Sequence, residues 1–192
     1  MSKQQQTVIS GFNEQIETMR QEEKEKGIRY LVSLTKFNTV VEVVYSNKPL
    51  SEIVPLTTET YAPSGWTALY DAIGKTIDTA QLGETDTIVT IFTDGQDNKS
   101  VEWKKDSIKI LIELRQRENK WGFVYFGANQ DAWAAGSSLG IANTVNYTME
   151  NTDGMLRSMG AVRATYTTSA MTGNYANLNN LTCDVDKKSL TS

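Results

Sequence analysis

Histidine is absent from this 192-residue sequence, and cysteine occurs once, at Cys183. Without histidine the chain cannot build a Ser-His-Asp or Cys-His catalytic group, a histidine general base or a histidine-ligated zinc site. A single cysteine excludes an intramolecular disulfide and a cysteine-rich zinc site, and it is consistent with a reducing compartment. Any metal that the chain binds must therefore be held mainly by oxygen ligands.

Long apolar runs and an excess of basic residues are also lacking. No run approaches the length of a membrane span, and the N-terminus has no signal-peptide pattern, so we expect a cytoplasmic protein. The net charge is -4, whereas nucleic acids and anionic membranes are bound by clustered basic surfaces. We therefore expect neither a nucleic acid nor a membrane as the main partner.

Proline is scarce, and all three prolines fall between residues 46 and 66, where we expect a loop. Elsewhere the apolar periodicity predicts helices and strands in alternation. The predicted helices span 4–26, 67–81, 101–117, 129–139 and 154–167, and the predicted strands span 28–37, 40–45, 87–92, 121–128 and 141–147. Ser100 is expected to cap the helix over 101–117.

This order predicts a doubly wound, Rossmann-like α/β domain over residues 1–170. Its sheet is expected to be mostly parallel, with one antiparallel hairpin strand and with helices on both faces. Residues 171–192 are rich in Asn, Thr and Ser, which is typical of a polar C-terminal tail. In that tail Cys183 is interpreted as a spectator thiol.

One strand stands out, because residues 87–92 are six β-branched or aromatic residues in succession. Such a run suits a strand that is covered on both faces, as in a parallel sheet. It ends in Thr93-Asp94-Gly95, and ligands of open α/β sheets bind at the carboxyl ends of the strands. Asp94 is therefore a candidate ligand-binding residue, and an ordinary Asp-Gly turn is the alternative interpretation.

A second segment, Gly65-Trp66-Thr67-Ala68-Leu69, opens a predicted helix some twenty residues earlier. Because it begins an element at the sheet edge where the strand ends, the Thr67 hydroxyl and the Asp94 carboxylate are expected to face one crevice. Magnesium accepts such oxygens, at about 2.1 Å in octahedral geometry. The residues expected to line the same rim are Trp66, Asp97, Asn98, Asn129 and Gln130.

Each of these rim residues also has a structural interpretation. Packing is the usual role of a tryptophan such as Trp66. For the polar rim residues the alternative is a role in turns and helix caps; these residues are Asp97, Asn98, Asn129, Gln130 and also Asp131, which is expected near the same rim. That alternative is preferred for Asn129 and Asp131, which are of types that cap helices well. Asp71, inside the predicted helix, is expected either to hydrogen-bond the neighbouring loop or to be a solvated acid.

The two segments resemble the metal-binding motifs of von Willebrand factor A domains. In that family the site combines an Asp-x-Ser-x-Ser loop, a Thr in a Gly-Thr-Ala-Leu-type loop and an Asp in a Thr-Asp-Gly turn. The resemblance covers roughly residues 4–170, and two of the three motifs match in order and spacing. The run Phe126-Gly127-Ala128-Asn129-Gln130-Asp131-Ala132 is similar to a phage and bacterial subgroup of such domains, which implies the host cytoplasm if the chain is phage-encoded.

The resemblance implies a non-enzymatic module that binds a partner protein through a metal ion. Thr67 would be a direct ligand of Mg²⁺ (or Mn²⁺ or Ca²⁺), and Asp94 would bind the ion directly or through water. An acidic side chain of the partner would complete the coordination.

The sequence departs from the family because it lacks the Asp-x-Ser-x-Ser loop and the apolar first strand before it. We expect either a truncation or start at an internal methionine, or a variant that fills the gap from its own tail or a partner chain. Weak or absent magnesium binding is expected. An unfilled strand position would leave unpaired backbone groups, which predicts poor solubility or a homo-oligomer formed through an open sheet edge.

Two other function classes stay open. One is a metal-independent structural or assembly subunit that uses the same crevice or a sheet edge. The other, less favoured, is a magnesium-dependent hydrolase using Asp94 and Asp97, although no base, nucleophile or basic phosphate-binding cluster accompanies them.

Overall fold

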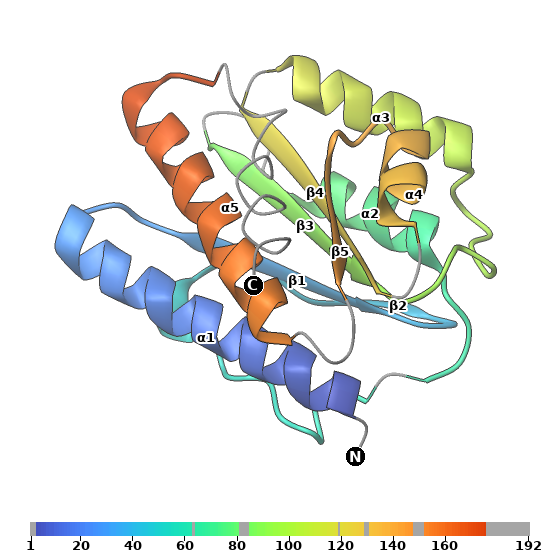
Figure 1. Cartoon of the computed structure of the whole chain (residues 1–192), viewed down its shortest axis with the longest axis horizontal. Coiled ribbons are helices and arrows are strands. Elements are labelled where there is room, and N and C mark those ends of the chain that lie inside the picture. The colour runs from blue at the N-terminus through green and yellow to red at the C-terminus, as the bar shows by residue number, and fades with distance from the viewer. Residues whose placement is uncertain are drawn as a thin grey trace. The chain divides into compact units, whose positions relative to one another are not determined.

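The computed structural model describes residues 3–62, 64–80, 85–118, 120–128, 131–147 and 152–175. In these segments the chain is a mixed α/β protein with five α-helices, a two-stranded antiparallel sheet and a three-stranded parallel sheet (Figure 1). It divides into two compact units, Met1–Gln81 with Asp97–Glu102, and Leu82–Gln96 with Trp103–Ser192. The α/β class is thus confirmed, with the strands in two hydrogen-bonded sheets.

The first unit contains a long helix, a hairpin and a shorter helix. Its elements are α1 (Lys3–Lys26), β1 (Leu31–Phe37), β2 (Val41–Pro49), the 3₁₀ turn η1 (Leu50–Glu52) and α2 (Leu69–Thr79). Helix α1 ends as predicted before Gly27, whose φ of 65° is the left-handed conformation of a helix stop. The antiparallel hairpin is also confirmed, but β2 continues to Pro49, beyond the predicted end at residue 45. Ile16, Leu50 and Ile53 form the buried core here.

Polar side chains of α1 hold the long loop that follows η1. Arg20 donates to the carbonyl of Ile53 (2.8 Å), Asn13 exchanges hydrogen bonds with the backbone of Leu56 (2.8 and 2.9 Å), and Gln5 donates to the carbonyl of Tyr61 (2.6 Å). The order of these contacts shows that the loop runs antiparallel to the helix. The backbone groups of this loop, which has no regular secondary structure, thereby gain hydrogen-bond partners.

The hydroxyl of Tyr45 on β2 is buried and has no hydrogen-bond partner in the described part of the chain. Since an unsatisfied buried polar group costs about 1–3 kcal/mol, Tyr45→Phe is expected to raise the free energy of unfolding by about 1 kcal/mol. Urea denaturation at neutral pH measures this gain. A variant less stable than the parent would contradict it.

The stability gained by Tyr45→Phe also depends on pH, because the Tyr45 hydroxyl titrates. Burial raises the pKa of Tyr45 from 10.0 to about 12. The protonated phenol therefore contributes stability that is complete below pH 10 and is lost as the pH rises toward 12. Because phenylalanine does not titrate, the advantage of the variant over the parent should grow across that interval.

The second unit alternates strands and helices. Its elements are β3 (Thr87–Thr93), α3 (Lys105–Arg117), β4 (Trp121–Ala128), α4 (Ala132–Ser138), β5 (Asn143–Tyr147) and α5 (Thr152–Thr172). The strand order is β3-β4-β5, and both pairs are parallel. Both predicted apolar strands are confirmed, but the middle strand of the sheet is β4, in which every residue is buried, and β3 lies at an edge.

Helices cover both faces of this parallel sheet. On one face Phe126 of β4 packs with α5 through Met155 and Val162, and it stacks on Phe92 of β3 at 4.6 Å between ring centroids. On the other face Gly136 of α4 approaches so closely that a Cβ atom there would lie 2.5 Å from the side chain of Thr144. Figure 1 shows α5 on one side of the strands and α3 and α4 on the other.

Several predicted boundaries are wrong. Helix α2 begins at Leu69 instead of residue 67, and α3 begins at Lys105 instead of residue 101. Helix α5 spans Thr152–Thr172 instead of residues 154–167. Asp131 is the N-cap of α4 and accepts a hydrogen bond from Ala134 N at 2.9 Å, as predicted.

Candidate binding site at the start of helix α2

The loop that precedes α2 is fixed to the β1–β2 turn. The backbone N–H of Trp66 donates to the Thr39 hydroxyl (3.2 Å), and that of Ala68 donates to the Asn38 carbonyl (2.8 Å). Gly65 has a φ of 87°, and a Cβ atom there would lie 2.8 Å from the Thr39 hydroxyl oxygen. Glycine is required because of both the left-handed conformation and this close approach.

Thr67 is held by the loop that follows β3. Its N–H donates to Asn98 Oδ1 (2.8 Å), and its carbonyl accepts from Asn98 N (3.0 Å). The Thr67 carbonyl thus accepts from Asn98 N, and the N–H four residues on, that of Asp71, donates to Ser100 instead. Helix α2 accordingly begins at Leu69 and not at residue 67 as predicted. The Thr67 hydroxyl makes no hydrogen bond to any residue that the structure describes, and the side chain is half-buried.

The same loop caps α2. The first N–H groups of a helix lack partners inside it, and the N-cap residue Ala68 has no side-chain oxygen to supply one. Asp97 Oδ1 accepts from Tyr70 N (3.2 Å), and the Ser100 hydroxyl oxygen accepts from Asp71 N (3.0 Å). Ser100 in turn donates to Asp97. The prediction that Ser100 caps a helix starting at residue 101 is therefore wrong, since it caps α2 across the chain.

Asp71 stabilises the turn that follows this cap. Its carboxylate is buried, at 7% exposure, and accepts from Val101 N (2.9 Å) and Glu102 N (3.0 Å). Of the two roles expected for Asp71, the structure supports the hydrogen bond to the loop. The two N–H groups belong to the turn before α3, and that helix starts only at Lys105.

Burial and a neighbouring charge also shape the electrostatics of the site. Burial raises the pKa of Tyr70, and the adjacent Asp97 carboxylate adds to the rise. Asp97 is half-buried, and a carboxylate at the start of a helix is stabilised by the positive end of the helix dipole. Trp66 and Val101, on the segments that the network joins, remain 61% and 72% exposed. Trp66 therefore does not have the packing role that was its alternative interpretation.

Four of the seven predicted site residues belong to this network or adjoin it: Trp66, Thr67, Asp97 and Asn98. Asp94 is exposed and lies in the second unit, in the turn directly after β3. The Thr93 side chain holds that turn through hydrogen bonds with the carbonyl (2.8 Å) and N–H (3.2 Å) of Gly95. Asn129 and Gln130 lie outside the described residues.

Sequence reasoning missed the role of Ser100 and left that of Asp71 open. A signal was present, because Asp71 is the third residue of α2, where acids are favoured by the helix dipole. Its actual partners lie thirty and thirty-one residues away along the chain. No local pattern identifies such partners.

Two oxygens of this network accept no hydrogen bond from the described residues: the Thr67 hydroxyl and the second carboxylate oxygen of Asp97. Both are hard ligands of the kind that magnesium prefers. Within the ranges that the structure describes, no group of three acidic, cysteine or histidine side chains is placed to hold a metal ion.

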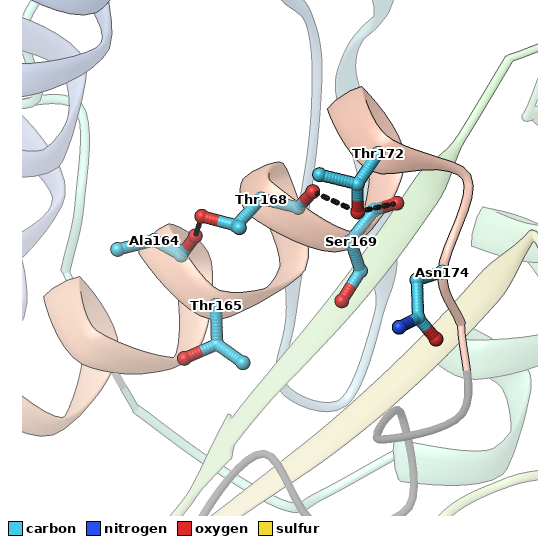
Figure 2. Close-up of a pocket in the computed structure, with 6 residues that line it drawn as sticks. All are labelled: Ala164, Thr165, Thr168, Ser169, Thr172 and Asn174. Carbon is cyan, nitrogen blue, oxygen red and sulfur yellow. Dashed lines mark hydrogen bonds between the residues drawn. The ribbon is translucent and has the colours of Figure 1, made fainter.

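A separate shallow cavity of about 370 Å³ lies along α5. Figure 2 shows that its hydroxyls are largely directed at the helix itself: Thr168 donates to the Ala164 carbonyl (2.9 Å), and Thr172 donates to that of Thr168 (2.8 Å). Among the residues that the structure describes, those that line this cavity carry no charge and include none of the predicted site residues.

A scan against models of known protein families, a search of curated proteins and a search of solved structures found no match to this chain. None of the described helices combines the length and the apolar character needed to cross a bilayer.

Proposed function

We propose that this chain is a non-enzymatic protein-binding module of von Willebrand A type, with the doubly wound, Rossmann-like fold of that family and an incomplete metal-ion-dependent adhesion site. The observation that carries the proposal is the reciprocal hydrogen bonding of Thr67 with Asn98. It holds Thr67, whose hydroxyl has no hydrogen-bond partner among the described residues, against the loop that follows the Thr93-Asp94-Gly95 turn.

Chain connectivity supports including Asp94 in the site. Three peptide steps separate Asp94 from Asp97, so their Cα atoms are at most about 11 Å apart, even in a fully extended chain. Asp97 is itself fixed to the start of α2 through Tyr70 N. The proposal therefore keeps Asp94 beside Thr67 as a metal ligand, as the family resemblance implies.

In this proposal the metal is magnesium, manganese or calcium, held weakly because the Asp-x-Ser-x-Ser oxygens are missing. The partner presents an acidic side chain to the ion and packs against Trp66. An exposed tryptophan beside partly buried polar groups is typical of residues that dominate binding energy at protein interfaces. The proposed compartment is the cytoplasm.

Trp66→Ala should weaken partner capture at least about ten-fold, because truncating such an anchor commonly costs 2 kcal/mol or more. Trp133→Ala is the matched control, since Trp133 is similarly exposed, at 66%, and lies on α4. The measurement is capture of the same partner from source-cell extract by immobilised parent and variants, with quantitative mass spectrometry. Equal losses in both variants, or none in either, would contradict the proposed surface.

The same assay with EDTA separates the proposal from its main alternative, a metal-independent structural or assembly subunit. That alternative is favoured by one observation: Asp97 and Asn98 already bind backbone N–H groups, so the loop keeps its shape without an ion. Capture that falls on adding EDTA and recovers with excess magnesium supports the metal-dependent module. Capture that is insensitive to EDTA supports the alternative. Turnover of generic phosphate esters with magnesium would instead favour the hydrolase that uses Asp94 and Asp97.

A further inference from the structure

Strand β3 has the composition of an interior strand but the position of an edge strand. Thr87–Thr93 contains no charge, proline or glycine, and it pairs with β4 in unbroken register over all seven residues. Among the described strands nothing pairs with its other edge. Natural edge strands are usually short, charged, bulged or interrupted by proline. The opposite edge, β5, fits that rule better, with five residues and two asparagines.

The backbone groups on the edge of β3 that faces away from β4 can be identified. Thr87 N donates to the Lys120 carbonyl, which immediately precedes β4, so Thr87 faces β4. Because successive residues of an extended strand direct their N–H and C=O groups to alternate edges, Ile88, Thr90 and Phe92 face outward. A row of such groups has the spacing of another β-strand, so a strand is the occupant that would satisfy it.

The sequence of β3 has an approximate two-fold symmetry about Thr90. It reads Thr, two apolar residues, Thr, two apolar residues, Thr. When two copies are aligned antiparallel on Thr90, each threonine lies opposite a threonine and each apolar residue opposite an apolar residue. Cross-strand pairs of these kinds are favourable. In this register the outward-facing residues also oppose one another, Thr90 against Thr90 and Ile88 against Phe92, as a hydrogen-bonded antiparallel ladder requires.

We propose that the edge of β3 that faces away from β4 is a self-association surface through which two copies of this chain form a symmetric dimer, with their β3 strands antiparallel about Thr90. The Thr90 side chain is exposed, so it is free to meet its symmetry mate. A two-fold interface of this kind closes on itself, which limits the assembly to a dimer. The inference does not rest on the proposed function, because it uses neither the Thr67 loop nor a metal.

The test uses charge at the two-fold axis, because residue 90 faces itself only in the proposed register. In sedimentation velocity over a wide concentration range, the parent chain should show a mass twice that of one chain. Thr90→Lys alone and Thr90→Glu alone should each raise the dimer dissociation constant at least about ten-fold, since like charges then lie opposite each other. An equimolar mixture of the two variants should recover dimers, because lysine then opposes glutamate.

Thr165→Lys is the matched control, since Thr165 is an exposed threonine on α5 and its substitution should leave dimerisation unchanged. Circular dichroism of each single variant should match that of the parent, and recovery in the mixture shows independently that both chains are folded. Four outcomes would overturn the proposal: a parent that is monomeric or forms larger assemblies, single variants that still dimerise, a mixture that stays monomeric, or a control that dissociates.

Discussion

Asp71→Asn is expected to lower the free energy of unfolding by about 2–3 kcal/mol. The buried carboxylate accepts hydrogen bonds from Val101 N and Glu102 N, one on each oxygen. An asparagine amide keeps one of these oxygens but places an NH₂ group against the other N–H, so a buried donor loses its partner, and bonds to a charged acceptor are worth more than those to a neutral one. Urea denaturation followed by circular dichroism measures the loss.

Asp78→Asn provides the control, because Asp78 is an exposed acid on the same helix with no hydrogen bond from the described residues. It should change stability by no more than about 0.5 kcal/mol. Hydrogen exchange should locate the Asp71→Asn effect at residues 97–102 and at the start of α2. Equal stabilities of the two variants would mean that the turn at Val101 does not depend on this carboxylate.

Phe126→Ala is expected to lower the free energy of unfolding by about 4 kcal/mol. Phe126 is fully buried in the middle strand, where it stacks on Phe92 and packs with α5. Truncating a buried phenylalanine removes apolar burial and leaves a cavity that tightly packed neighbours fill only in part. The measurement is the same denaturation experiment, with hydrogen exchange reporting loss of protection in β3 and β4.

Phe126→Leu is the companion variant, because it keeps most of the side-chain volume and should cost about 1–1.5 kcal/mol. Phe126 and Asp71 belong to different compact units. Phe126→Ala should therefore speed hydrogen exchange in β3 and β4, whereas Asp71→Asn should speed it around Val101. A Phe126→Ala loss no larger than that of Phe126→Leu would show that the surrounding residues collapse into the space.

The elements that sequence predicted well are those whose signals are local. Gly27 ends α1, Asp131 caps α4, and the apolar run of β4 is buried throughout. The start of α3 was wrong because a local capping signal at Ser100 lost to partners on α2 that are distant in sequence. A propensity pattern contains no information about such partners.

The position of β3 illustrates a second limit. An unbroken apolar run indicates that both faces of a strand are covered, and Phe92 does pack beneath α5. It does not indicate whether both edges are paired, because edges are made of backbone groups that every residue carries. The pattern therefore predicted the strand and its parallel pairing, but not that β3 lies at the edge of its sheet.

The candidate site was also predictable only in part, because some of its residues are identified by local patterns and others only by distant partners. The type and spacing of Thr67, Asp97 and Asn98 singled them out, and the structure joins their segments through hydrogen bonds. The contributions of Asp71 and Ser100 became visible only with coordinates. The metal-binding role of Thr67 and Asp94 stays a prediction, as does the rim role of Asn129 and Gln130.

The antiparallel contact between α1 and the proline-containing loop bears on how the chain acquires its structure during synthesis. Residues from Ile53 onward leave the ribosome after the whole α1 sequence has been synthesised, so each new stretch of the loop can bond to side chains that are already present. The Arg20 contact spans 33 residues, the Asn13 contact 43 and the Gln5 contact 56. Because the entropy of closing a chain grows only slowly with its length, the nearest contact bears most of the cost and the later ones add little. The loop can thus form its contacts with α1 one after another, from the C-terminal end of the helix toward its N-terminal end.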